Sequence, residues 1–478
     1  MECRRNPNTD SLEGKELRSV IVLSFVFLCV FTAFISIQNL QSSINEEGGL
    51  GIISLLCVYI FSTLSNIFAP LAIKILTAKW VIIVSCASHL LYAISNFYPR
   101  LYTLVPTSIL LGCITGPFWT SQGMYITTCS FKYAERTKKN ASHILGKFFS
   151  VFFFIYVWSS IIGNLLSSVL LNLKSDKPHN LNITLTLNIS NTSTSAKCCN
   201  RCVIEYCPRT EIIKDKPEES SQDKASLYYL LGAFVTCVFI GLLIASILLP
   251  PIPRGKPRGQ STSHSSLSSL ASCGTLLRKP TLLLLVPSFV AFSWAETFRW
   301  TDVTNAFISC MDGVSVVGYV LAAHGFCSGV STFLMSKVAK YIGRHRLIVI
   351  LYITYISVFV GYYFTPESRP ISLMAVIVCL HGIMEGPISA QLQATLGWMH
   401  GNSKEAAFAN LGAWKCVSSA LYFSISNSVC VRIKVILLLV LYILALPTYI
   451  GAELLFRKQR KETEIEIEVT ETLKDNKM

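Results

Sequence analysis

Ionisable residues recur within long apolar stretches in the second half of the chain. Glu296, Arg299 and Asp302 follow one another at intervals of three residues, a spacing that places side chains on one face of a helix. A charged side chain inside a membrane is costly unless it is paired or functional. The triplet therefore predicts ion pairs along one helix face, near the outer end of a membrane span.

Four further ionisable residues fall in later apolar stretches, namely His324, His381, Glu385 and Lys415. Glu385 and Glu296 could couple a proton or a solute, with Lys415 as the counter-charge. The alternative is a structural ion pair that locks helices together, because structural networks also place charges in membranes. We expect His324 to be a hydrogen-bonded, buried imidazole.

The first half of the chain offers mainly neutral amides at the corresponding positions. These are Gln38, Asn39 and Gln41 at the end of the first apolar stretch, and Gln122 in the fourth. A central cavity between the two halves would then have one neutral wall and one charged wall.

Enzyme motifs are missing from the sequence. It contains no Gly-x-Ser-x-Gly elbow, no Walker loop and no His-Glu-x-x-His pair. The sequence therefore favours a protein without catalytic residues, cofactor or metal.

The composition is typical of an α-helical membrane protein. Of the 478 residues, 52% are hydrophobic and only 14% are charged, whereas soluble domains have about 25% charged residues. The apolar stretches predict about twelve transmembrane helices in two six-helix bundles, a major-facilitator-like arrangement. We place the spans at 19–38, 50–73, 80–97, 101–126, 146–171, 227–250, 280–299, 314–336, 346–364, 370–392, 406–430 and 433–456.

The basic residues indicate the orientation. A net charge of +14 would suggest a nucleic-acid partner in a soluble protein, but in a membrane protein Lys and Arg gather in cytosolic segments. Most of the 41 Lys and Arg fall on the side of the N-terminus, once the long loop 172–226 is set aside. We expect both termini in the cytosol, no nucleic-acid partner, and residence in the plasma membrane or an endosomal membrane.

The loop 172–226 has features of the secretory lumen. Disulfides persist there, and four cysteines lie close together in the loop. They could pair with one another in three ways or bind zinc, and the oxidising compartment favours disulfides. Asn-x-Ser/Thr glycosylation sites begin at Asn182, Asn188 and Asn191, and the cysteines are Cys198, Cys199, Cys202 and Cys207.

A Pro- and Ser-rich segment divides the chain, because its composition cannot form a packed core. The predicted organisation is a cytosolic tail (1–18), a first bundle (19–250), a cytosolic linker (251–279), a second bundle (280–456) and a cytosolic tail (457–478).

Several motifs lie in order along nearly all the spans. They include Gln38-Asn-Leu-Gln41-Ser-Ser43, Gly116-Pro-Phe-Trp119-Thr-Ser-Gln122 and His381-Gly-Ile-Met-Glu385. They also include Ser403-Lys-Glu-Ala-Ala-Phe-Ala-Asn410. In these motifs the chain resembles the Unc-ninety-three family, most closely its homologue A branch.

The resemblance implies a major-facilitator-like fold and one of two roles. One is the regulation of a two-pore potassium channel, and the other is the trafficking of nucleic-acid-sensing Toll-like receptors. Two departures stand out: the segment Lys340–Arg346 lacks the acid of the major-facilitator gating loop, and Lys415 lies three residues after the expected arginine position.

We therefore expect an accessory protein that regulates or traffics another membrane protein, within the lipid bilayer. The alternative is a secondary transporter of a small solute or ion, favoured by the charged wall.

Overall fold

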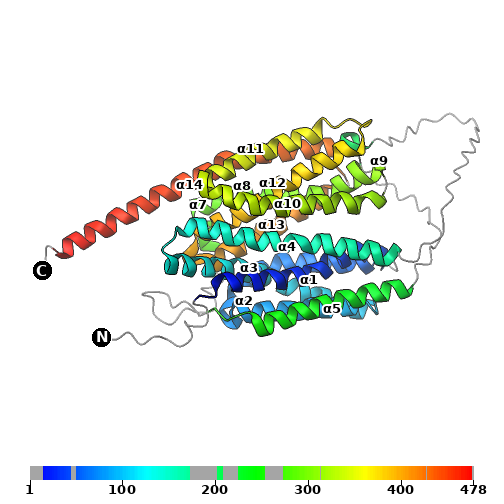
Figure 1. The fold of residues 1–478 in the computed structure, drawn as a ribbon, viewed down its shortest axis with the longest axis horizontal. Coiled ribbons are helices and arrows are strands. Elements are labelled where there is room, and N and C mark those ends of the chain that lie inside the picture. The colour runs from blue at the N-terminus through cyan, green and yellow to red at the C-terminus, as the bar shows by residue number, and fades with distance from the viewer. Residues whose placement is uncertain are drawn as a thin grey trace, which may run out of the picture.

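The computed structural model describes residues 14–44, 50–172, 202–207, 224–252, 273–312, 314–426 and 428–475. This part of the chain contains helices and turns but no β-strand. Its long helices run alongside one another (Figure 1). Ten of the described helices are long and apolar enough to cross a membrane, which agrees with the predicted multi-pass architecture.

Five long helices form the first half in the part of the chain that the structure describes. Within it, α2 packs against α3, while α1 packs against α4 and α5. Aromatic rings fill the centre; the rings of Phe27 and Phe118, for example, stack with centroids 4.2 Å apart. The helices are α1 (Glu16–Ile44), α2 (Leu50–Ser95), α3 (Leu101–Thr137), α4 (Ala141–Asn172) and α5 (Lys224–Leu248).

Helix α2 is broken at Thr77, where φ is 70° and ψ is 155°. These angles lie outside the helical region, so two helices meet there. The break falls between the predicted spans 50–73 and 80–97. Helix α2 therefore contains the whole of the first span and all but the last two residues of the second.

The second half begins with a segmented span. It consists of α7 (Pro280–Leu283), α8 (Val286–Phe298), the π-helix η3 (Arg299–Ser309) and α9 (Cys310–Asp312). The remaining elements are α10 (Val314–Ile342), α11 (Arg344–Tyr363), α12 (Ile371–Met399), the short η4 (Gly401–Ser403), α13 (Lys404–Ser426) and α14 (Val431–Asp475). Helix α14 continues well beyond the predicted span end at 456 (Figure 1).

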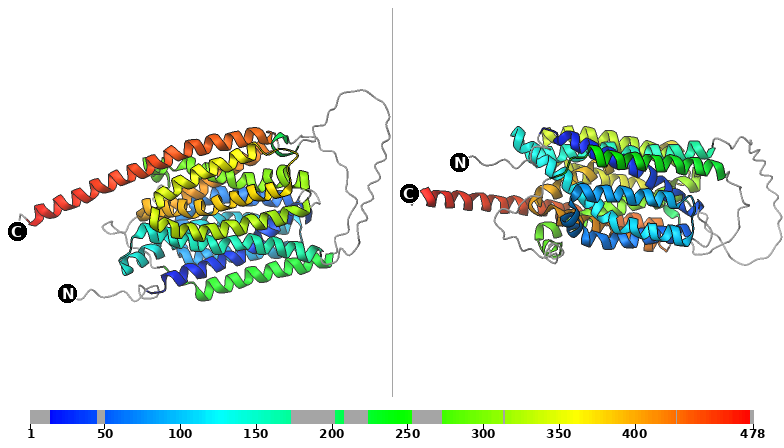
Figure 2. Two further views of the ribbon diagram at one scale, coloured as in Figure 1. Left: turned by 45° about the horizontal axis from the view of Figure 1, so that its top comes forward. Right: turned by 90° about the horizontal axis from the view of Figure 1, so that it is seen from below.

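The two halves contact each other through two sets of helices. Helix α4 packs against α10 and α12, and α13 packs against α2 and α3. The approach is very close at Gly123 in α3, because an added Cβ there would lie 2.3 Å from the ring of Phe408 in α13. Figure 2 shows the two groups of helices from two further directions.

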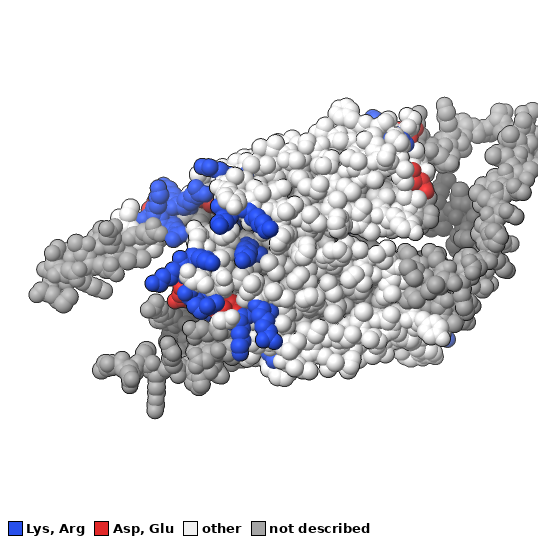
Figure 3. Space-filling view, viewed as in Figure 1, with Lys and Arg blue, Asp and Glu red and all other residues white. Residues whose placement is uncertain are grey.

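The two ends of the helix array differ. Helix α1 begins and α14 ends at the same end (Figure 1), and Lys and Arg side chains gather there (Figure 3). We call this the basic end. At the opposite end lies the short segment 202–207, which includes the 3-10 helix η2 (Val203–Glu205).

Segment 202–207 corrects the predicted cysteine pairing. Cys202 bonds to Cys310 and Cys207 bonds to Cys430, so pairing within the loop is wrong for these two residues. The segment docks on the second half, where the N–H of Val431 donates to the carbonyl of Tyr206 at 3.0 Å. This docking brings Cys202 and Cys207 within bonding distance of cysteines that are 108 and 223 residues further along the chain. The remaining loop residues of interest lie outside the described residues: Cys198, Cys199, Asn182, Asn188 and Asn191.

Candidate functional site

A buried ion pair lies at the centre of the second half. The Arg299 side chain donates from Nε to Glu385 Oε2 at 2.8 Å and from Nη2 to Oε1 at 2.9 Å. Both residues are less than a tenth exposed. Arg299 is the first residue of η3, and Glu385 lies in the middle of α12. The two parallel bonds fix the orientation of both side chains.

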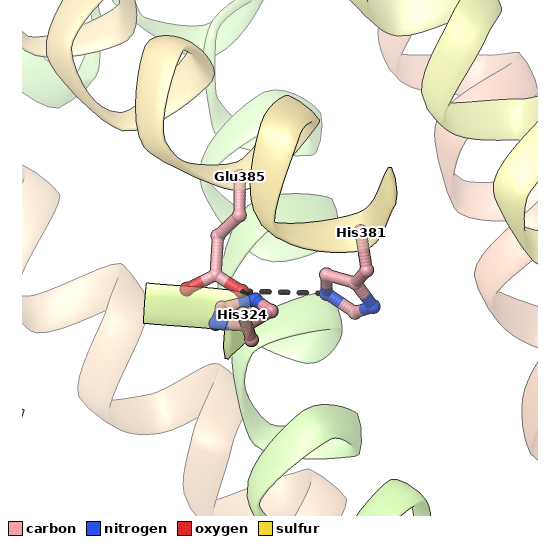
Figure 4. Close-up of side chains that lie close together, drawn as sticks. All are labelled: His324, His381 and Glu385. Carbon is pink, nitrogen blue, oxygen red and sulfur yellow. Dashed lines mark ion pairs between the residues drawn. The ribbon is translucent and has the colours of Figure 1, made fainter. Parts of the chain in front are cut away.

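Two histidines lie beside the same carboxylate (Figure 4). His381 Nε2 is 3.3 Å from Glu385 Oε2, one helical turn away on α12. Its two ring nitrogens also lie 2.6 Å from the hydroxyl of Tyr355 and 3.2 Å from that of Tyr362. This imidazole is therefore held by two of the tyrosines of α11.

His324 reaches the cluster from α10. Its Nε2 lies 3.5 Å from Glu385 Oε2 but makes no hydrogen bond among the described residues. The ring is buried, as we expected, but the expectation of a hydrogen-bonded imidazole is wrong for this nitrogen. His324 is thus the least constrained member of the cluster.

The cluster has the residue types of a metal site, but its carboxylate is already bound by Arg299. One ligand atom each from His324, His381 and Glu385 lie within 4.8 Å of one another. A cation there would compete with the guanidinium of Arg299, which already binds both oxygens of Glu385. The donor set therefore fits an ion-pair network better than a metal centre.

A second buried ion pair joins Asp302 to Lys434, which the sequence analysis missed. Lys434 Nζ donates to Asp302 Oδ1 at 2.5 Å and to the carbonyl of Ser426 at 2.8 Å. Tyr422 donates its hydroxyl to Asp302 Oδ2 at 2.5 Å. The feature of the sequence that could have revealed this pair is Lys434 itself, a lone lysine near the start of the last apolar stretch.

A third pair joins Glu296 to Lys415, with Oε2 and Nζ 3.0 Å apart. These side chains are 35% and 30% exposed, unlike the other two pairs. Lys415 is therefore a counter-charge for Glu296, as predicted, while the partner of Glu385 is Arg299.

The predicted pairing within the triplet Glu296, Arg299 and Asp302 is wrong. Each of these residues pairs with a different helix, through Lys415 on α13, Glu385 on α12 and Lys434 on α14. The π-helix that begins at Arg299 explains the difference. A π-helix changes the number of residues in each turn, so a spacing of three no longer places side chains on one face.

Neither of the two described amides of the first half, Gln38 and Gln122, forms a hydrogen bond with a charged residue of this network. Gln38 donates to the hydroxyl of Tyr59 on α2. Gln122 is buried, and its side-chain nitrogen and oxygen have no hydrogen-bond partner among the described residues. Asn39 and Gln41 have side chains outside the described part of the structure.

Comparisons with known proteins agree on the family and the fold. Residues 41–450 match the family model described as "Ion channel regulatory protein UNC-93". A Xenopus laevis protein named unc-93 homolog A is 28% identical over 452 residues, covering 94% of this chain and 95% of that protein. The human protein of the same name is 30% identical over 439 residues, covering 91% and 93%.

A more distant relative from Caenorhabditis elegans is 24% identical over 458 residues, covering 95% of this chain and 63% of that protein. Its name proposes it as a "potassium channel regulatory protein".

Solved structures show the same fold at low sequence identity. The E. coli fucose:proton symporter FucP is 12% identical, with a TM-score of 0.65 over 91% of this chain and 98% of that chain. The human organic anion transporter MFSD10 is 11% identical, with a TM-score of 0.58 over 92% and 100%. The chain therefore has a major facilitator fold.

Proposed function

The chain belongs to the UNC-93 family of ion channel regulatory proteins, and on that premise we propose that it is a non-enzymatic accessory protein that regulates or traffics another membrane protein. The observation that supports this proposal is the mutual neutralisation of charge within the two buried ion pairs of the second half. Arg299 and Glu385 satisfy each other through two hydrogen bonds, and Lys434 satisfies Asp302. Such pairs hold helices in a fixed arrangement, whereas a coupling site needs a group that exchanges its partner.

We propose an ion channel, and specifically a potassium channel, as the partner. The family description and the name of the Caenorhabditis elegans relative support this choice. A two-pore channel is the class to try first, because the sequence motifs resemble a family with that role.

Retrieval from a mild detergent tests the proposed partnership. We would co-express the tagged chain with a two-pore potassium channel and measure the molar ratio of the two proteins after affinity retrieval. We expect a fixed ratio that Glu296→Gln does not change, since the proposed function needs no solute at that position. Retrieval of the chain without the channel, across a panel of potassium channels, would contradict the proposal.

The alternative is a secondary transporter, which one observation favours. The Glu296–Lys415 pair is about one-third exposed, so its charges are accessible to a solute. In that case a solute would raise the melting temperature of the purified protein. Glu296→Gln would abolish this shift, while Glu135→Gln, at an exposed position on α3, would retain it.

We further propose twelve spans in two bundles, 19–250 and 280–456, joined by the linker 251–279. The break of α2 at Thr77 supports counting that helix twice, and α13, which is not among the ten helices counted above, supplies the remaining span. The concentration of Lys and Arg at the basic end supports cytosolic termini (Figure 3). The disulfides at the opposite end support a lumenal loop 172–226.

Glycosylation tests this orientation. Replacing Asn182, Asn188 and Asn191 one after another by Gln should lower the apparent mass in steps. After glycosidase treatment, the wild type and the variants should have the same apparent mass. A mass that is insensitive both to the enzyme and to these changes would contradict the lumenal loop.

A further inference from the structure

A pocket of about 310 Å³ opens at the basic end, where the two halves meet. One wall is the beginning of α4 from the first half. The other walls come from α10, α11 and α12 of the second half. The lining residues include Asn140, Gly146, Lys147, Lys340, Arg344 and Gln391.

The charge of this pocket is of one sign. Lys147, Lys340 and Arg344 line it, and none of the described lining residues is acidic. Lys147 and Lys340 are exposed, and they come from opposite halves of the molecule. Three positive charges around one hollow repel one another unless an anion lies between them.

Arg344 is buried without a carboxylate of its own. It is 8% exposed, its Nη1 donates to the carbonyl of Ala394 at 3.3 Å, and its Nε has no partner among the described residues. Glu453 on α14 lies close enough to act on Arg344 electrostatically, but it forms its ion pair with Arg457. A buried guanidinium with unused donors is costly, so a ligand that accepts from it would be stabilising.

Gln391 on α12 gives a second unsatisfied group in the same wall. It is 1% exposed, and neither its side-chain nitrogen nor its side-chain oxygen has a partner among the described residues. An added Cβ at Gly146 on α4 would lie 3.0 Å from the Gln391 oxygen. The absence of a side chain at Gly146 therefore allows this amide to approach the first half closely. The amide can donate to an anion that enters the pocket.

Two helices also begin at this pocket. Helix α4 follows Asn140, and α11 follows Gly343, which has a φ of 84° and offers no side-chain cap. At the start of α4, which is 32 residues long, the side-chain oxygen of Asn140 already accepts from the N–H groups of Ser142 and His143. The 20-residue α11 begins without a side-chain cap, so its N-terminus attracts an anion through both its N–H groups and its dipole.

We propose that this pocket binds a phosphate-bearing anion that bridges the two halves at the basic end. Lys147 contacts it from the first half, and Lys340, Arg344 and Gln391 contact it from the second. The volume exceeds the space of a single water, about 30 Å³, by roughly tenfold, so a phosphorylated headgroup or small molecule fits better than chloride. Binding holds the halves together at this end.

The test uses the full-length protein and two probes that separate the sources of phosphate. Inositol hexakisphosphate represents a soluble ligand, and nanodiscs with or without phosphatidylinositol 4,5-bisphosphate represent a lipid headgroup. We expect at least one probe to raise the melting temperature. We expect the double variant Lys147→Gln/Lys340→Gln to bind that probe about tenfold or more weakly, because two charge-assisted hydrogen bonds are lost.

Lys337→Gln is the matched control, because Lys337 is exposed on α10 but does not line the pocket. The proposal is supported if either probe binds the wild type and the Lys337→Gln control but binds the double variant more weakly. The probe that responds then shows whether the phosphate comes from a soluble molecule or from a lipid headgroup. Three results would overturn it: no response to either probe, equal binding by the double variant, or an equal shift with sulfate at the same ionic strength.

Discussion

At the scale of single residues, three ion pairs join the segmented span α8–η3 to α12, α13 and α14. Glu296, Arg299, Glu385 and Lys415 all take part in ion pairs, as their positions in apolar stretches indicated. Their partners could not be predicted, because pairing depends on which helices meet and on the π-helix at Arg299. Lys434 was missed because it lies beside a span boundary, where a lysine usually reaches the interface.

Glu385→Gln should destabilise the protein strongly. The change leaves Arg299 buried with a neutral partner, and breaking a buried ion pair costs about 3–5 kcal/mol. The melting temperature in detergent, followed by size-exclusion chromatography of heated samples, measures the effect. Glu135→Gln, at an exposed position, is the control and should not change it.

The double variant Arg299→Leu/Glu385→Leu sharpens this prediction. Removing both charges should restore much of the lost stability, because no unpaired ion remains. If Glu385→Gln were as stable as the wild type, the ion pair would not hold α12 to η3.

His400 predicts a pH dependence of stability. Burial, followed by the nearby charge of Lys279, lowers the pKa of His400 from 6.5 to about 4. The unfolded chain therefore binds a proton that the folded chain does not, so stability is full above pH 6.5 and falls as the pH drops towards 4. His400→Gln should reduce the slope of melting temperature against pH in that window, and an unchanged slope would rule out this residue as the cause.

At the scale of elements, breaks in the helical backbone mark where one predicted membrane span ends and the next begins. The predicted gap between the second and third spans corresponds to the break at Thr77. The segmented span α8–η3–α9 could not be predicted, since a π-helix has no periodic signal distinct from an α-helix over 11 residues.

Thr77→Gly should stabilise the break in α2. A β-branched residue at a φ of 70° is strained by about 1–3 kcal/mol, and glycine removes that strain. We expect a small rise in melting temperature for Thr77→Gly and none for Thr77→Val, which keeps the β-branch. A loss of stability in Thr77→Gly would argue against the positive φ.

The disulfides make a direct prediction about segment 202–207. Peptide mapping without reduction should find the peptide of Cys202 joined to that of Cys310, and that of Cys207 joined to Cys430. The reduced sample, run in parallel, should lose both joined peptides. A link between Cys202 and Cys207 would contradict the docking of this segment on the second half.

At the scale of the whole molecule, the fold class follows from the sequence because bilayer crossing imposes long apolar helices. The helical, major-facilitator architecture and the family were both predicted and are confirmed. The close contact of the halves at Gly123 and the pocket at the basic end were not predicted, because they depend on side chains from helices far apart in sequence.

The central proposal is that this molecule acts on another membrane protein. The most direct measurement is the whole-cell potassium current in cells that express a two-pore potassium channel with or without the chain, with channel at the surface quantified in parallel. We predict that the chain changes the current, through the number of surface channels or the current per channel, and that Glu296→Gln does so equally. A current and a surface density that stay the same across the channel panel, together with solute uptake that Glu296→Gln abolishes, would contradict the accessory role and favour transport.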